Sequence, residues 1–68
     1  MSSVAKVIEI SASSPKSFED AIESGIAKAA KTVKNITGAW VNEEKVRVEN
    51  GQVVEWRVNL KVSFVLDE

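Results

Sequence analysis

The sequence predicts an α+β fold, in which one amphipathic helix packs on a three-stranded antiparallel sheet in the order β-α-β-β. Three observations predict it. A helical apolar period occupies the first half of the chain, two long extended segments follow, and Asn50-Gly51 between them is a strong hairpin signal. Because no linker, repeat or low-complexity stretch interrupts the pattern, residues 1–68 are predicted to form a single domain.

The first strand is predicted over residues 4–12. Its β-branched and apolar residues, Val4, Val7, Ile8 and Ile10, are spaced by polar ones. Residues 13–16, with the sequence Ser-Ser-Pro-Lys, then form a short polar loop.

The helix is predicted over residues 17–36. Ser17, followed three residues later by Asp20, resembles a capping box at its start. Acidic residues occur early and lysines late, which favours the helix dipole at both ends. Gly38 is predicted to end the helix, since glycine readily adopts the left-handed conformation that closes one. The apolar positions that step by three or four residues are Phe18, Ile22, Ile26, Ala29 or Ala30, Val33 and Ile36.

Two further strands are predicted over residues 39–49 and 53–66. The last strand alternates regularly, so its even-numbered residues form one apolar face directed at the helix. The apolar residues of the preceding strand, among them Trp40 and Val46, are also even-numbered. A two-residue turn would place the two apolar sets on opposite faces. We therefore predict a three- or four-residue loop with Gly51 in the left-handed conformation.

The size of the chain predicts self-association. A domain of about 60 residues buries only roughly 60% of the surface that its unfolded chain exposes. The usual supplements are disulfides, a metal or oligomerisation, and the sequence has no Cys and no His. The last strand, at about 3.3 Å per residue, is also longer than the helix that covers it. We therefore expect other copies of the chain to cover the excess.

Composition excludes several classes of function. Nine basic and ten acidic residues are mixed along the chain, so no basic surface for nucleic acid is expected. No apolar run could span a membrane and no signal peptide is evident, so a cytoplasmic location is predicted. Without Cys, His or a glycine-rich phosphate loop, we predict no catalytic residue and no enzymatic activity. Glu43 and Glu44 should lie on opposite faces of a strand.

Four side chains, from two tryptophans and two cations, are candidates for either a structural role or a ligand contact. Trp56 is predicted to be a core residue. Trp40, just after the helix, could pack in the core or an interface, or stack on a planar ligand. Lys45 and Arg57 are odd-numbered neighbours across the hairpin, and they form either a surface ladder of charges or a phosphate contact.

Several strings, in this order, resemble the dodecins, a family of small flavin-binding proteins of bacteria and archaea. The strings are Val7-Ile8-Glu9-Ile10, residues 13–22, residues 26–29 with 31–33, and residues 56–67. The resemblance implies a hollow spherical homododecamer with flavins held in pairs at two-fold interfaces. It implies storage or scavenging of flavin, such as FMN or riboflavin, with no turnover.

Two positions depart from the family pattern. The Trp that stacks on the flavin is expected at position 38, which is Gly38 here, and Trp40 stands two residues later. The Gln that hydrogen-bonds the ring is replaced by Arg57, whose guanidinium donates hydrogen bonds but cannot accept any. The candidate flavin-binding residues are therefore Trp40, Arg57, Gly38 and Lys45, where a cation would meet phosphate or ribityl oxygens. The alternative is a dodecin-like shell that binds metal ions or another nucleotide-like anion without flavin stacking.

Overall fold

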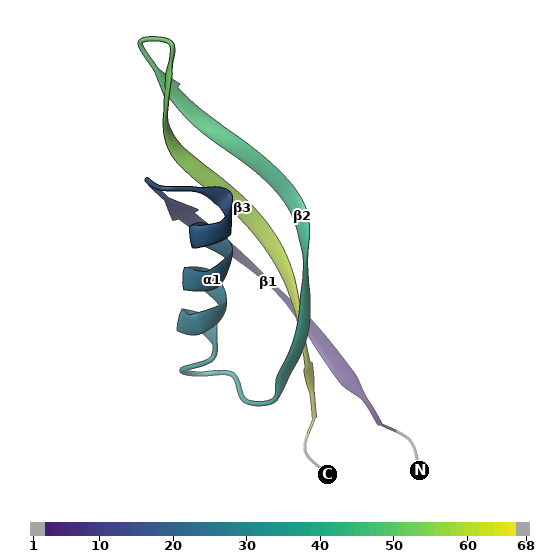
Figure 1. Ribbon diagram of the computed structural model, residues 1–68. Coiled ribbons are helices and arrows are strands. Elements are labelled where there is room, and N and C mark those ends of the chain that lie inside the picture. The colour runs from purple at the N-terminus through teal and green to yellow at the C-terminus, as the bar shows by residue number, and fades with distance from the viewer. Residues whose placement is uncertain (1–2, 67–68) are drawn as a thin grey trace.

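The computed structural model describes residues 3–66 and has the predicted β-α-β-β order. The elements are β1 (Ala5–Ser14), α1 (Phe18–Ala29), β2 (Ile36–Glu49) and β3 (Gln52–Val65). The three strands form one antiparallel sheet in the order β1-β3-β2, with α1 lying across one face (Figure 1). The predicted fold class is confirmed. Residues 1–2 and 67–68, at the ends of the predicted domain, lie outside the described residues.

The start of the helix follows the predicted local chemistry. Ser17 is the N-cap, and its hydroxyl accepts a hydrogen bond of 2.9 Å from the backbone N–H of Asp20. The Asp20 carboxylate does not return to Ser17, as a capping box would require. It accepts a hydrogen bond of 2.6 Å from Ser14, the buried last residue of β1. This contact ties the end of the first strand to the first turn of the helix.

The end of the helix differs from the prediction. Helix α1 stops at Ala29, where 36 was predicted, and a turn follows in which the N–H groups of Thr32 and Val33 both donate to the Ala29 carbonyl. Asn35 takes the left-handed conformation, with φ of 65°, and redirects the chain into β2. Gly38 is not the stop, because it lies inside β2 and pairs with Ser63. Pairing with distant β3 overrides the local helical period.

The hairpin prediction was wrong about the turn. Glu49 pairs with Gln52, so the loop has only the two residues Asn50 and Gly51, with φ of 52° and 74°. These are the positive values of a type I′ turn. The apolar faces are matched by a β-bulge instead, because the pairing shifts between Arg47 and Val48. Beyond this bulge Val46 pairs with Trp56, so these even-numbered apolar residues lie on one face of the sheet as predicted, and Trp56 is partly buried.

The core lies between α1 and the strands β1 and β3. Its buried hydrophobic residues are Ala21 from the helix and Val58, Leu60 and Val62 from β3. Partly buried side chains surround them: Ile8, Ile10, Ala12, Phe18, Ile22, Ile26 and Ile36. Helix α1 packs against β1 and β3, and β2 with the hairpin end extends away from it (Figure 1). Within residues 3–66 no helix is long and apolar enough to cross a membrane.

Candidate functional site

The side of the sheet that faces away from α1, here called the outer face, carries a set of polar side chains. They are arranged in rows across the strands, since residues paired in adjacent strands project to the same side. One row is Ser13, Arg57 and Lys45, the next is Ser11, Asn59 and Glu43, and the third is Glu9, Lys61 and Trp40. Glu44 pairs with Val58 on the opposite, helix-facing side, so Glu43 and Glu44 diverge as predicted.

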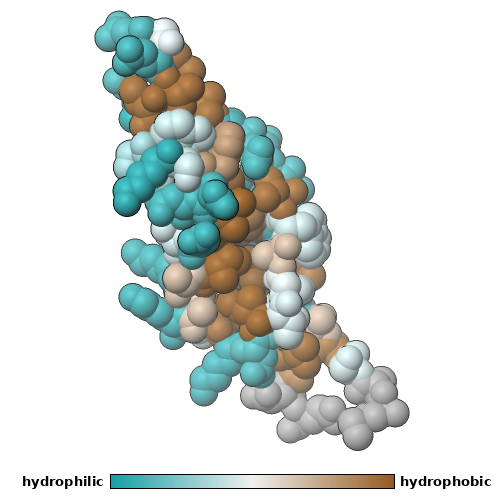
Figure 2. All heavy atoms as spheres, in the orientation of Figure 1, coloured by the Kyte–Doolittle hydropathy of each residue, from teal (hydrophilic) through white to brown (hydrophobic). Residues whose placement is uncertain are grey.

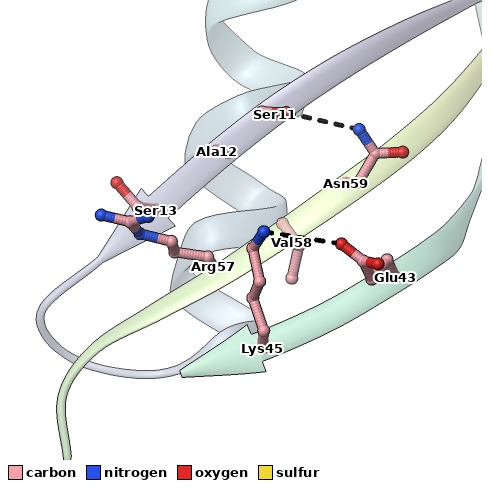
Figure 3. A pocket seen from close by; sticks show the side chains of 8 residues that line it. All are labelled: Ser11, Ala12, Ser13, Glu43, Lys45, Arg57, Val58 and Asn59. Atoms are coloured by element: carbon pink, nitrogen blue, oxygen red, sulfur yellow. Dashed lines mark hydrogen bonds and ion pairs between the residues drawn. The ribbon is translucent and has the colours of Figure 1, made fainter. Parts of the chain in front are cut away.

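A shallow pocket of about 370 Å³ lies on the outer face (Figure 3). It is lined by Ser11, Ala12, Ser13, Glu43, Lys45, Arg57, Val58 and Asn59. Lys45 extends toward Glu43, and the two charged groups are 3.7 Å apart. Both side chains are more than 60% exposed, so this ion pair contributes little to stability and leaves both groups accessible to a ligand.

Arg57 is tied to a carboxylate at the border of this pocket. Its Nε–H donates a hydrogen bond of 2.5 Å to Glu55, and the Nε of Arg47 lies 3.5 Å from the same oxygen. The hydrogen bond from Arg57 holds the pKa of the Glu55 carboxyl below its ordinary value, and the charges of Arg57 and Arg47 add to the effect. The positive charge of Arg57 is thus already partly compensated within the subunit.

Trp40 lies on the outer face, not on the helix-facing side where the predicted hairpin would place it. A second β-bulge lies between Val41 and Glu43, where Asn42 is an extra residue without a pairing partner in β3. The residues of β2 before Asn42 therefore project to the opposite side of the sheet from the one that strict alternation would give. Trp40 therefore pairs with Lys61 on an edge strand of the sheet, and its side chain is 52% exposed. A flat aromatic surface is left open to solvent on a largely polar face, with the exposed Val7 in the neighbouring row.

Gly38 occupies the next row, opposite Ser63, on the same face as Trp40. The Ser63 hydroxyl donates a hydrogen bond of 3.2 Å to the Gly38 carbonyl. A Cβ added at Gly38 would lie 3.3 Å from that hydroxyl oxygen, so a side chain here would require Ser63 to move slightly. The absence of a side chain leaves open space beside Trp40.

The four predicted site residues share the outer face, but they do not line one pocket of the subunit. Lys45 and Arg57 do line the same pocket. Lys61, the partner of Trp40, lies four residues along β3 from Arg57, which is about 13 Å at 3.3 Å per residue. A ligand that contacts both Trp40 and Arg57 must therefore be long, or must take one of them from a second copy.

Sequence reasoning missed the polar side chains that surround Trp40 and the pocket. The side chain of Asn42 donates a hydrogen bond of 3.0 Å to Asn59, which in turn donates one of 3.3 Å to Ser11. Lys61 donates a hydrogen bond of 2.9 Å to Glu9. The alternating pattern of β3 indicated that Lys61 and Asn59 share a polar face. Their partners depend on the register between strands far apart in sequence.

Comparison with known proteins agrees with this architecture. The dodecin family model matches residues 4–67. The chain belongs to the dodecin family. The predicted resemblance is thus confirmed. A dodecin from Streptomyces davaonensis, 34% identical, has a structure that superposes with a TM-score of 0.94 over 100% of both chains.

Two curated dodecins are also similar in sequence. Calcium dodecin of Mycobacterium tuberculosis is 37% identical over 62 residues, which is 91% of this chain and 87% of that protein. The dodecin of Thermus thermophilus is 32% identical over 68 residues, which is 100% of this chain and 99% of that protein. A crystal structure of the Mycobacterium protein, described as calcium chelating with a novel calcium-binding site, has a TM-score of 0.80 and covers 94% of this chain and 91% of its own.

Proposed function

We propose that the protein binds flavin, FMN or riboflavin, as a homododecamer and stores or scavenges it without catalysing a reaction. Membership of the dodecin family supports the class of ligand. The observation that carries the proposal for this chain is Trp40, which is half exposed on the polar outer face of an edge strand. Leaving so large an apolar surface in water is unfavourable, and a stacked planar ring would cover it.

The shape of the subunit supports self-association. Its radius of gyration is 14.2 Å, against about 11 Å for a compact domain of 68 residues. It exposes 5009 Å², whereas a monomeric protein of 7.4 kDa exposes about 4200 Å². The excess, about 800 Å², equals the area that one partner contributes to a standard interface.

The uncovered apolar surface lies where the hairpin projects beyond α1. Figure 2 shows a hydrophobic area just below the turn, on the same side of the sheet as the helix. The exposed apolar side chains of the hairpin arms include Val41, Val46, Val48 and Val53, each about 40% to 54% exposed. A second copy packing on these valines would bury them, as a symmetric closed assembly requires.

Flavin titration tests the proposed ligand. Riboflavin or FMN added to the purified protein should lose most of its fluorescence, because an indole stacked on the ring quenches its excited state. Trp40→Ala should weaken binding at least tenfold, and Trp40→Phe, which keeps a smaller aromatic face, should weaken it less. Unchanged flavin emission at micromolar wild-type protein would contradict the proposal.

The mass of the native particle tests the assembly independently of the ligand. Twelve times 7.4 kDa is about 89 kDa, which light scattering separates easily from a monomer. Val48→Lys should shift the particle toward smaller species, because a charge would be buried in the expected contact. Gln52→Lys, at the exposed end of the same hairpin, adds the same charge outside the apolar set and is the matched control. A wild-type mass of 7.4 kDa at micromolar concentration would refute the assembly.

A second candidate function is binding of a metal ion or a nucleotide-like anion, without flavin stacking. The similar protein called calcium dodecin favours the metal, and the paired cations Lys45 and Arg57 favour the anion. Within residues 3–66 of one subunit, no three acidic side chains are grouped as metal ligands, so several copies would have to supply the carboxylates. Calorimetry with calcium chloride and with coenzyme A separates these cases from flavin binding.

A further inference from the structure

Trp40, Lys61 and Glu9 form one row across all three strands, here called the Trp40 row. Lys61 is the direct cross-strand partner of both other residues, in β2 on one side and β1 on the other. Adjacent strands are about 4.8 Å apart, so the row spans roughly 10 Å from the indole to the carboxylate. This is comparable to the long dimension of a three-ring heterocycle. The aromatic surface and the polar pair could thus contact the same flat ligand.

The polar end of the row is ionised and held in place. The Lys61 ammonium donates a hydrogen bond of 2.9 Å to a Glu9 carboxylate oxygen. This bond, a second one from the Asn59 side chain, and the charge of Lys61 lower the pKa of the Glu9 carboxyl. Asn59 is itself fixed by Asn42. The Glu9 side chain is still 52% exposed and Lys61 32% exposed, so both groups can meet a ligand.

The pair supplies the chemistry that Arg57 lacks. The pyrimidine edge of a flavin ring is an imide, which presents a carbonyl, an N–H and a second carbonyl side by side. Recognition of the N–H together with one carbonyl requires an acceptor beside a donor, and a guanidinium contains only donors. Lys61 is a donor and the Glu9 carboxylate is an acceptor with free lone pairs.

We propose that the Lys61 and Glu9 pair recognises the imide edge of a flavin ring stacked on Trp40. Lys61 donates to a ring carbonyl, and Glu9 accepts the imide N–H. The other carboxylates of the outer face within residues 3–66 lie in other rows: Glu43 beside Lys45, Glu55 between Arg57 and Arg47, and Glu49 beside Arg47. This assignment rests on the proposed flavin binding, and it names the residues that distinguish an imide from other flat rings.

The test compares two ligands that differ by one methyl group. Riboflavin carries the imide N–H, and N3-methylriboflavin replaces it with a methyl group while keeping the stacking surface. Wild-type protein should bind riboflavin at least tenfold more tightly, since the N–H to carboxylate hydrogen bond is charge-assisted. Glu9→Leu should abolish this preference, so that the variant binds the two ligands about equally. It should leave the affinity for N3-methylriboflavin within about threefold of wild type.

Two controls separate this assignment from general effects. Glu23→Leu removes the same charge from an exposed position of α1, remote from the outer face, and should keep the full preference for riboflavin. Lys61→Met should weaken both ligands together, since both retain the ring carbonyls. Equal binding of the two ligands by the wild type would overturn the assignment and leave the flavin proposal standing. Binding of neither ligand would overturn the flavin proposal, and the assignment with it.

Discussion

Replacement of Gly25 by Ala should destabilise the protein, although the change favours a helix. Gly25 lies in α1 where the helix passes over β1. A Cβ added there would lie 2.9 Å from the Cβ of Ala12, and 3.7 Å from side-chain atoms of Ile10 and Leu60. The Ala12 Cβ is attached directly to the backbone of β1 and cannot rotate away. The helix and the strand must therefore move apart.

Two opposing terms set the magnitude. An Ala in a helix interior is more favourable than Gly by about 1 kcal/mol. Forcing an extra methyl group into a tight contact costs about 1 to 3 kcal/mol. The net effect is a loss of about 1 kcal/mol in the free energy of unfolding. For a domain of this size that is a fall in Tm of about 4 to 8 °C.

Thermal unfolding at one fixed protein concentration measures the effect, since the stability of an oligomer depends on concentration. Ser24→Ala, at the neighbouring exposed helix position, has no such contact and should raise stability by a few tenths of a kcal/mol. Adding Ala12→Gly to Gly25→Ala removes the opposing Cβ, so the two changes should be strongly non-additive. If Gly25→Ala alone raised Tm as Ser24→Ala does, the close packing of α1 on β1 would be refuted.

Three further predictions follow from local contacts. Ser17→Ala removes the cap on the Asp20 N–H and should cost about 1 kcal/mol in denaturant unfolding, whereas Ser17→Asp should retain most of the stability. Gly51→Val should cost about 1 to 2 kcal/mol, because the residue has φ of 74° and no neighbour within 4 Å to offset the strain; Gly51→Asn should cost less. Because the pKa of Glu9 is lower in the folded state, its pairing with Lys61 stabilises that state fully at pH values above the ordinary pKa of 4.5. This stabilisation is lost as the pH falls through the lower pKa of the folded state. Lys61→Met should flatten this part of the Tm-against-pH curve, and an unchanged curve would show that the pair contributes nothing.

Local residue chemistry was sufficient for much of the fold. The Ser17 cap, the helical period from Phe18 and the strict alternation of β3 are all short-range patterns. Each reflects interactions within a few residues of the chain. The alternation also identified Val58, Leu60 and Val62 as residues of the helix-facing side, and these are the buried residues of β3.

The candidate site was predictable only in part. Arg57 could be selected from the sequence because it occupies the position of the family's Gln, and Trp40 because it is an aromatic residue two positions after the family's Trp. Their arrangement could not be predicted, since it depends on where each bulge interrupts the pairing. One inserted residue, Asn42, is enough to move Trp40 from the helix-facing side to the outer face. The pairing of Lys61 with Glu9 likewise depends on register across 52 positions of sequence.

The sequence by itself determined the β-α-β-β order, because helix period, strand alternation and the Asn50-Gly51 turn each act over short distances. Only the tertiary structure decided that α1 ends at Ala29 and that the hairpin keeps a two-residue turn. The two-residue turn is the local preference of Asn50-Gly51, and it is kept because the β-bulge between Arg47 and Val48 brings the apolar residues to one face. The early end of α1 follows instead from the pairing of β2 with β3, whose hydrogen bonds and buried side chains join residues far apart in sequence. Such pairing outweighs local preference wherever the two conflict.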